Sequence, residues 1–195
     1  FSSAASSFRD SACSSSGQRA SGATSAPLGS RMAARISRSR TEPGSRPGSS
    51  LYKLWQAATS DSNIAYTNLY YLTSTDGMHY TLQGMALQTG DGTPYDTRNI
   101  ADPTVVRVGD RHYLYYRAQT LSLAYSIGIA VSTDGGRTFV KRGNIPVGPA
   151  GAFDAAFVFR PVVLYDPAAT EFEMFYLGQD ASSVLRIGYA TSPDG

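Results

Sequence analysis

The sequence predicts an all-β fold, a fragment of a β-propeller, and a long internal repeat is the main reason. Three stretches contain nearly the same strand and tight turn: residues 69–77 (LYYLTSTDG), 127–135 (IGIAVSTDG) and 187–195 (IGYATSPDG). The aspartates of these turns lie 58 and then 60 residues apart. A repeat of this length, built from strands and turns, is typical of propeller blades. After residue 60 we find no amphipathic helix of three turns, which favours an all-β class.

The repeat extends well beyond the turns. Residues 102–106 (DPTVV) match residues 160–164 (RPVVL) at an offset of 58. Residues 112–119 (HYLYYRAQ) match residues 172–179 (FEMFYLGQ) at an offset of 60. Two residues are therefore inserted between the matched strands. Residues 166–170 (DPAAT) are the natural place for them, because turns accept insertions and strands do not.

The repeated unit has the order of strands that a propeller blade requires. A β-branched run at 104–108 is followed by a Gly-Asp turn, an aromatic strand at 112–117 and a further strand at 127–132. We expect residues 51–195 to form about two and a half four-stranded blades: the end of one, a complete one and most of a third. A five-bladed ring of this period would need roughly 295 residues, so we expect a partial propeller.

The first 50 residues differ in composition from the rest. They contain 16 serines and seven arginines but only two aromatic residues, and their net charge is +5. Such a segment cannot bury enough apolar surface to offset its ordering entropy, so we expect residues 1–50 to be a disordered tail. A Ser- and Arg-rich, acid-poor composition is typical of a transit peptide, which would direct the protein to a plastid or another organelle. A low-complexity extension explains the composition equally well.

Several classes of partner find no support in the sequence. Residues 51–195 carry a net charge of −3, so the basic pI comes from the tail and does not indicate a nucleic-acid partner. No stretch of 18 apolar residues is present, and we expect no membrane partner. The only cysteine is Cys13, and the two histidines do not match in the repeat, so we expect no metal site and no cofactor.

Part of the repeat resembles a known group of enzymes. Residues 101–106 (ADPTVV), with the Gly-Asp turn and the Tyr-Leu-Tyr-Tyr strand that follow, are similar to the blade opening of the furanosidase-type five-bladed propeller glycosidases, which are glycoside hydrolase families 43, 32, 68 and their relatives. Residues 187–195 (IGYATSPDG) are also similar to their blades. The resemblance implies a glycoside hydrolase with a carbohydrate substrate, in which three carboxylates meet at the central funnel.

Asp102 is the candidate catalytic residue that this resemblance implies. It directly precedes Pro103 at the start of the innermost strand of its blade, where it would act as base, nucleophile or stabilising carboxylate. Cleavage of a glycosidic bond requires one ionised and one protonated carboxyl group at a fixed separation. A structural explanation is also open, since Asp and Pro both favour the beginning of a strand.

Arg160 occupies the position of Asp102 in the next blade. An arginine there would bind a substrate hydroxyl or carboxylate, hold Asp102 ionised, or form an ion pair between neighbouring blades. The usual general acid, a glutamate, is missing, because Phe159 stands at its position. Glu171 and Glu173 lie on the following strand, away from the expected axis. We therefore expect the acid to lie outside this chain or to be absent.

Asp96 and Asp154 match each other in the repeat, six or seven residues before the innermost strand. The loop that carries them would lie near the mouth of the funnel, where either carboxylate could bind sugar hydroxyls. Because both positions repeat, a shared structural role such as capping backbone amides is an equal alternative.

The repeated turns support two other interpretations of the function. Residues 132–139 fit the spacing of an Asp box, in which the aspartate accepts amide hydrogen bonds and the glycine supplies a positive φ. Together with Arg160, this is similar to a sialidase-like six-bladed propeller. The missing glutamate favours instead a non-catalytic propeller that binds carbohydrate or protein.

Overall fold

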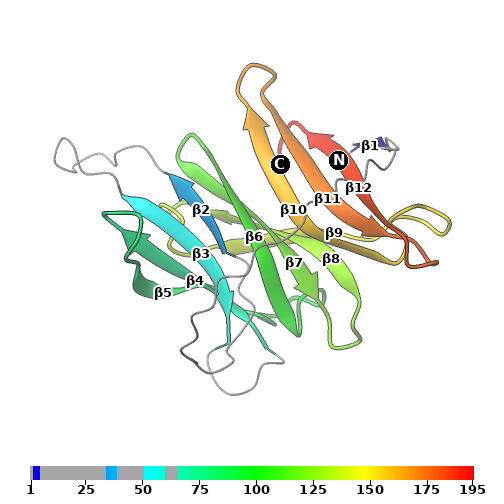
Figure 1. Cartoon of the computed structure of the whole chain (residues 1–195), viewed down its shortest axis with the longest axis horizontal. Coiled ribbons are helices and arrows are strands. Elements are labelled where there is room, and N and C mark those ends of the chain that lie inside the picture. Colours follow the sequence, from blue (N-terminus) through cyan, green and yellow to red (C-terminus); the bar gives the residue numbers. More distant parts are fainter. Residues whose placement is uncertain (1, 5–33, 39–50, 60–65) are drawn as a thin grey trace, which may run out of the picture.

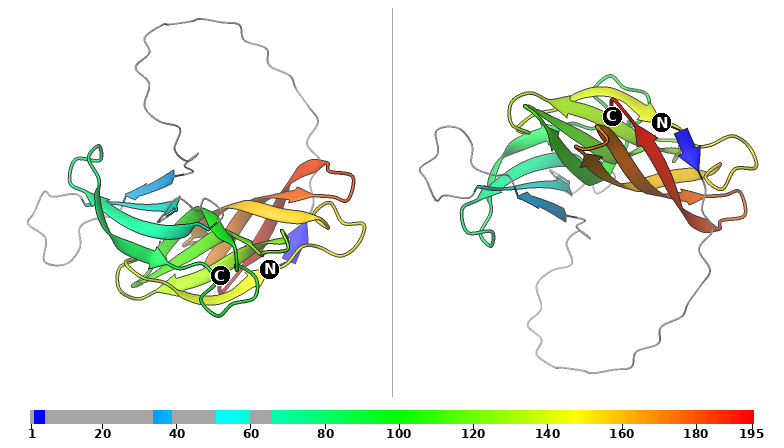
Figure 2. Two further views of the ribbon diagram at one scale, coloured as in Figure 1. Left: turned by 90° about the horizontal axis from the view of Figure 1, so that it is seen from below. Right: turned by 90° about the horizontal axis from the view of Figure 1, so that it is seen from above.

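The computed structural model describes residues 2–4, 34–38, 51–59 and 66–195. These residues form strands and turns without a helix, arranged as three four-stranded antiparallel sheets. Figure 1 shows the sheets following one another, the first in blue and teal, the second in green and the third in orange and red. The views in Figure 2 place the second sheet between the other two. The predicted all-β, propeller-like class is confirmed.

The three sheets have matching strand orders. The first consists of β2 (Ala34–Arg38), β3 (Tyr52–Ala58), β4 (Asn68–Ser74) and β5 (Thr81–Leu87). The second consists of β6 (Asn99–Val108), β7 (Arg111–Gln119), β8 (Tyr125–Ser132) and β9 (Val140–Ile145). The third consists of β10 (Phe157–Asp166), β11 (Glu171–Gln179), β12 (Leu185–Ser192) and β1 (Ser2–Ala4). Residues 166–170, within which the two inserted residues lie, comprise the end of β10 and the turn before β11, as the repeat predicts.

Two short strands lie within residues 1–50. β2 pairs with β3 and completes the first sheet, while β1 pairs with β12 as a fourth strand of the third sheet. An open sheet edge presents unpaired backbone N–H and C=O groups that accept an extended segment of almost any sequence, so composition alone does not predict such pairing. The remainder of the tail, including Cys13 and most of the proposed transit peptide, lies outside the described residues.

Two hydrophobic clusters hold the sheets together. The cluster between the first and second sheets contains Trp55, Tyr71, Leu114 and Tyr116. The cluster between the second and third sheets is built on Tyr115 and Ile127 from the second sheet and on Phe172, Met174 and Tyr176 from the third. Each sheet therefore buries a face against the next, which is how a twisted four-stranded sheet gains stability.

The turn after β8 fastens the second sheet to the first. The Trp55 Nε1–H donates to the Gly136 carbonyl at 2.7 Å, and the Lys53 ammonium donates to the Gly135 carbonyl at 2.9 Å. A Cβ on Gly136 would lie 2.5 Å from the Trp55 ring, so only glycine, with its φ of +84°, fits there. This turn therefore contacts the neighbouring sheet directly.

The same turn is closed by a carboxylate. Asp134 accepts the backbone N–H of Arg137 at 2.9 Å and that of Thr138 at 3.0 Å, and it accepts the Ser132 hydroxyl at 2.7 Å. Burial alone would raise the pKa of Asp134, but the hydrogen bonds from Thr138, Ser132 and Arg137 outweigh it and lower the pKa to about 2. The turns at Ser74 and Ser192 make the same Ser-to-Asp hydrogen bond, at 2.8 and 2.7 Å.

Asp134→Asn is expected to reduce stability in a pH-dependent way. Because the pKa of Asp134 in the folded state is about 2, below its ordinary value, the charge stabilises the fold above about pH 4, and this contribution is lost as the pH falls towards 2. Solvent screening limits the loss at pH 7 to about 1 kcal/mol or less. Urea unfolding from pH 7 to pH 3 measures this difference, with Asp91→Asn in an exposed loop as control. A stability difference between the wild type and Asp134→Asn that does not change with pH would contradict the lowered pKa of Asp134.

One face of the third sheet is apolar and exposed. Its residues match buried positions on the second sheet: Phe175 matches Tyr115, and Ile187 matches Ile127. Tyr115 and Ile127 have no exposed surface because the third sheet covers them, whereas Ile187 is 65 % exposed. Val162 and Leu164 extend this exposed face along β10.

The exposed face predicts self-association at high protein concentration, because contiguous apolar surface favours burial. Ile187→Asp is expected to lower the average mass measured by sedimentation. Leu121→Asp is the matched control, since Leu121 is 62 % exposed but lies in the turn between β7 and β8. Equal effects of the two substitutions, or none from Ile187→Asp, would show that this face does not drive association.

Candidate functional site

The innermost strands of the second and third sheets share an unusual bulge. In β6, two residues, Asp102 and Pro103, stand opposite one residue of β7, and β10 repeats this with Arg160 and Pro161 opposite one residue of β11. Asp102 has a φ of 50° and Arg160 a φ of 53°. Residues other than glycine rarely adopt this conformation, which costs roughly 1–2 kcal/mol. Bulges of this kind turn a side chain in a new direction and are frequent beside active sites.

Asp102 is paired with an arginine on the adjacent strand. The Arg117 Nε lies 3.3 Å from the Asp102 carboxylate, and the two side chains are 29 % and 19 % exposed. The contact is an ion pair without the geometry of a hydrogen bond. Arg117 lies directly opposite Ala101 in the register of β6 and β7, so the bulge that follows Ala101 brings the Asp102 carboxylate back to it.

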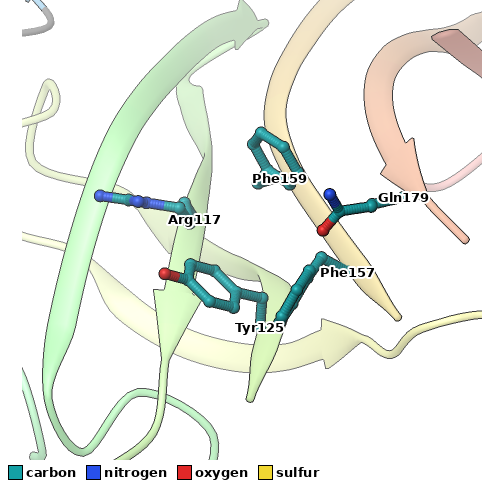
Figure 3. A pocket seen from close by; sticks show the side chains of 5 residues that line it. All are labelled: Arg117, Tyr125, Phe157, Phe159 and Gln179. Atoms are coloured by element: carbon teal, nitrogen blue, oxygen red, sulfur yellow. The ribbon is translucent and has the colours of Figure 1, made fainter. Parts of the chain in front are cut away.

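A pocket of about 220 Å³ lies beside this ion pair: Arg117 lines it, whereas Asp102 reaches it only through its pairing with Arg117. Its walls come from the second and third sheets and are shown in Figure 3; they are Arg117, Tyr125, Phe157, Phe159 and Gln179. The figure shows the side chains of Arg117 and Gln179 on opposite sides of the aromatic rings. The pocket thus combines a charged wall, an apolar wall and an amide, which is the usual composition of a small-molecule site.

The three aromatic rings of the pocket pack on one another. Tyr125 meets Phe157 edge-on, with centroids 4.8 Å apart and an interplanar angle of 83°, and its centroid is 6.4 Å from that of Phe159. The Arg117 guanidinium lies 5.7 Å from the Tyr125 centroid, within the range of a cation–π contact. These contacts fix the rings without filling the pocket.

A buried hydrogen bond sets the relative positions of the two innermost strands. The Thr104 hydroxyl donates to the Pro161 carbonyl at 2.7 Å. Thr104 directly follows the bulge of β6, and Pro161 belongs to the bulge of β10, so this bond joins the two strands at their bulges. Asp102 and Arg160 nevertheless form no ion pair with each other, because Asp102 pairs with Arg117. The ion pair between blades considered for Arg160 is therefore not formed with Asp102.

Arg160 is exposed, and its guanidinium lies 5.9 Å from the centroid of Phe159, a wall of the pocket. Arg160 thus stands at the edge of the pocket that contains Arg117. Asp102 and Arg160, both candidates from the repeat, lie on matching bulges of two strands that the Thr104 hydrogen bond joins, but they do not contact each other.

Asp96 has a different environment. Its side chain has no exposed surface, and its carboxylate accepts the Tyr116 hydroxyl at 2.9 Å and pairs with the Lys141 ammonium at 2.8 Å. It also accepts the Thr93 hydroxyl. Burial, and next the charge of Asp96, raise the pKa of Tyr116, so the phenol remains a hydrogen-bond donor. A sugar hydroxyl could reach this carboxylate only if the loop moved.

Asp154 repeats the arrangement of Asp96 in the third sheet. Its carboxylate accepts the Tyr176 hydroxyl at 2.8 Å. Each tyrosine ring lies over a glycine of the next strand: a Cβ on Gly128 or on Gly188 would be 2.3 Å from the ring of Tyr116 or Tyr176 respectively. The repeated Asp, Tyr and Gly form an internal anchor for the loop, and neither Asp96 nor Asp154 lines the pocket.

No glutamate lines the pocket within the part of the chain that the structure describes. Glu173 lies on β11, where it accepts the Tyr189 hydroxyl at 3.0 Å. The absence of a glutamate before Pro161, noted in the sequence, therefore applies to the pocket as well.

Sequence reasoning missed three residues of this site: Arg117, Tyr125 and Gln179. Gln179 could have been noticed, because the glutamine that ends β11 matches the one that ends β7. Its amide donates to the Ser183 carbonyl at 3.3 Å. Arg117 matches Leu177 in the repeat, so only its geometry reveals the pairing with Asp102.

The described residues offer neither a cluster of metal ligands nor a long apolar helix. No group of three or more His, Cys, Asp or Glu side chains is placed to hold a metal ion among them. Nor do they include a helix of the length and apolarity needed to cross a membrane.

Solved structures of glycoside hydrolases resemble this chain. The neighbours include Zg3597, a family 117 glycoside hydrolase from the marine bacterium Zobellia galactanivorans, with a TM-score of 0.65, 18 % identity and coverage of 84 % of this chain and 53 % of that one. A thermostable family-43 glycoside hydrolase has a TM-score of 0.61 and 17 % identity, and the match covers 86 % of this chain and 51 % of that one. The sucrose-6-phosphate hydrolase of Lactobacillus gasseri has a TM-score of 0.61 and 15 % identity, and the match covers 74 % of this chain and 30 % of that one.

The chain spans about half the length of the first two neighbours and less of the third. No protein-family model matches it, and neither does any curated protein sequence. At identities of 15–18 % the structural likeness shows the fold. The chain therefore shares the propeller fold of these glycoside hydrolases.

Proposed function

We propose that the protein acts on carbohydrate and hydrolyses glycosidic bonds, with Asp102 as the ionised carboxylate of the reaction. One observation carries the proposal: Asp102 stands on a strained bulge and is paired with Arg117, which lines an aromatic pocket between two sheets. Backbone strain of this kind persists where the surroundings enforce it, and it is concentrated at functional sites. The fold shared with glycoside hydrolases supports the same conclusion.

The pocket suits a sugar ring. Tyr125, Phe157 and Phe159 offer apolar surface on which the C–H face of a sugar packs, while Arg117 and Gln179 offer polar groups for its hydroxyls. Arg117 also orients the Asp102 carboxylate, which would serve as base or nucleophile at the anomeric carbon. Arg160 contributes a contact to the substrate from the edge of the pocket. Asp96 and Asp154 support the site as anchors of its loops.

Hydrolysis needs a second carboxyl group as general acid. No carboxyl group lines the pocket among the described residues, and Asp102 adjoins it only through Arg117. A second function therefore has specific support: a propeller that binds carbohydrate without cleaving it. Phe159, at the position where the resemblance places a glutamate, favours this alternative. Turnover separates the two functions, because both predict binding and only the first predicts cleavage.

Asp102→Asn is expected to lower the turnover of an aryl furanoside or an aryl xyloside by about 10³-fold or more, because it removes the reacting carboxylate. The measurement is the release of the aryl group by the intact protein, with circular dichroism to verify the fold. Asp110→Asn, in the exposed turn between β6 and β7, is the control and should retain activity. Full activity of Asp102→Asn would remove Asp102 from the mechanism. A wild-type protein that binds the sugar without turnover would support the second function.

Tyr125→Ala is expected to weaken binding of an oligosaccharide about tenfold, since it removes one aromatic wall and leaves Asp102 and Arg117 in place. Calorimetric titration measures this affinity. Tyr66→Ala is the control, because Tyr66 is exposed outside the pocket. If both substitutions leave the affinity unchanged, the sugar does not occupy this pocket.

A further inference from the structure

The two arginines at the pocket are in different electrostatic situations. The charge of Arg117 is compensated by Asp102 at 3.3 Å. Arg160 has no Asp or Glu within ion-pair distance among the described residues, and its recorded partner is the ring of Phe159. Asp102, Arg117 and Arg160 together therefore carry one uncompensated positive charge at the edge of an aromatic pocket.

The position of Arg160 is fixed by the backbone. The bulge holds Arg160 at a φ of 53°, and the hydrogen bond from Thr104 to the Pro161 carbonyl braces the next residue against β6. Phe159, the preceding residue, is itself a wall of the pocket. A guanidinium on a braced and strained strand loses less entropy on binding a ligand than one on a free loop.

The chemistry of this guanidinium indicates what it binds. Arginine presents a planar pair of N–H donors that matches a carboxylate in a bidentate arrangement, and it stacks on aromatic rings as it does here. Neutral hydroxyls do not compensate its charge. We propose that the pocket takes a sugar that carries a carboxylate, a uronic acid residue, with the carboxylate on Arg160 and the ring against the aromatic wall. This inference rests on the proposed carbohydrate function of the same pocket.

The test is a calorimetric titration of the whole 195-residue chain with three probes: an oligogalacturonide, its neutral methyl ester and a sulfated galactose oligosaccharide. The oligogalacturonide is expected to bind most tightly, and its affinity should fall with added salt. Arg160→Gln should weaken its binding about tenfold and leave the methyl ester unaffected. The matched control is Arg142→Gln, which removes the same charge from an exposed position on β9. Circular dichroism confirms that both variants are folded.

Each other outcome overturns a defined part of the proposal. Equal affinities for the oligogalacturonide and its methyl ester would exclude a carboxylate subsite and leave the proposed carbohydrate function standing. Tighter binding of the sulfated sugar would show that the site selects a different anion. An equal loss of affinity for the oligogalacturonide in Arg160→Gln and Arg142→Gln would show that the overall charge of the protein causes the effect, and not a contact at Arg160. If none of the three sugars binds, this inference fails, while the proposed function is decided separately by the turnover of the aryl furanoside or aryl xyloside.

Discussion

The rest of this structure depends on the burial of one face of each four-stranded sheet against the next sheet. A single sheet of this size has no core of its own, and the two hydrophobic clusters lie between consecutive sheets. Trp55 and Tyr115 occupy matching positions in the repeat, and both are buried at such a junction. The turn at Gly136, whose carbonyl accepts the Trp55 Nε1–H, lies at the junction of the first and second sheets. It follows β8 of the second sheet and contacts β3 of the first.

The candidate site follows from this packing. Where the second and third sheets meet, their innermost strands carry matching bulges, and one hydrogen bond from Thr104 joins them. The bulges hold Asp102 and Arg160 in a conformation that an isolated strand would leave. The two hydrophobic clusters stabilise the packed sheets enough to keep Asp102 and Arg160 in this strained conformation. Two candidate site residues of opposite charge, Asp102 and Arg160, thus come from one structural device used twice.

The repeat predicted the sheets, the place of the inserted residues and the positions of Asp102 and Arg160, because strand periodicity and turn chemistry are local properties. It could not predict the partner of Asp102, since Arg117 has no counterpart of its own charge in the next sheet and is reached only through the bulge. The position of Asp96 near a funnel mouth was inferred from its loop, but the direction of its side chain depends on Tyr116 and Lys141, which lie 20 and 45 residues away. The pairing of β1 and β2 depends on open sheet edges rather than on composition.

The pocket takes its walls from two sheets, and this links its occupancy to the cohesion of the fold. Tyr125 belongs to the second sheet and Phe157 to the third, so a molecule between them touches both. A ligand that binds only when the two sheets are packed shifts the equilibrium towards the packed state, by about 2.7 kcal/mol at a concentration of 100 times its dissociation constant. A ligand in the pocket would thus add a third junction between the sheets, alongside the hydrophobic cluster and the Thr104 hydrogen bond.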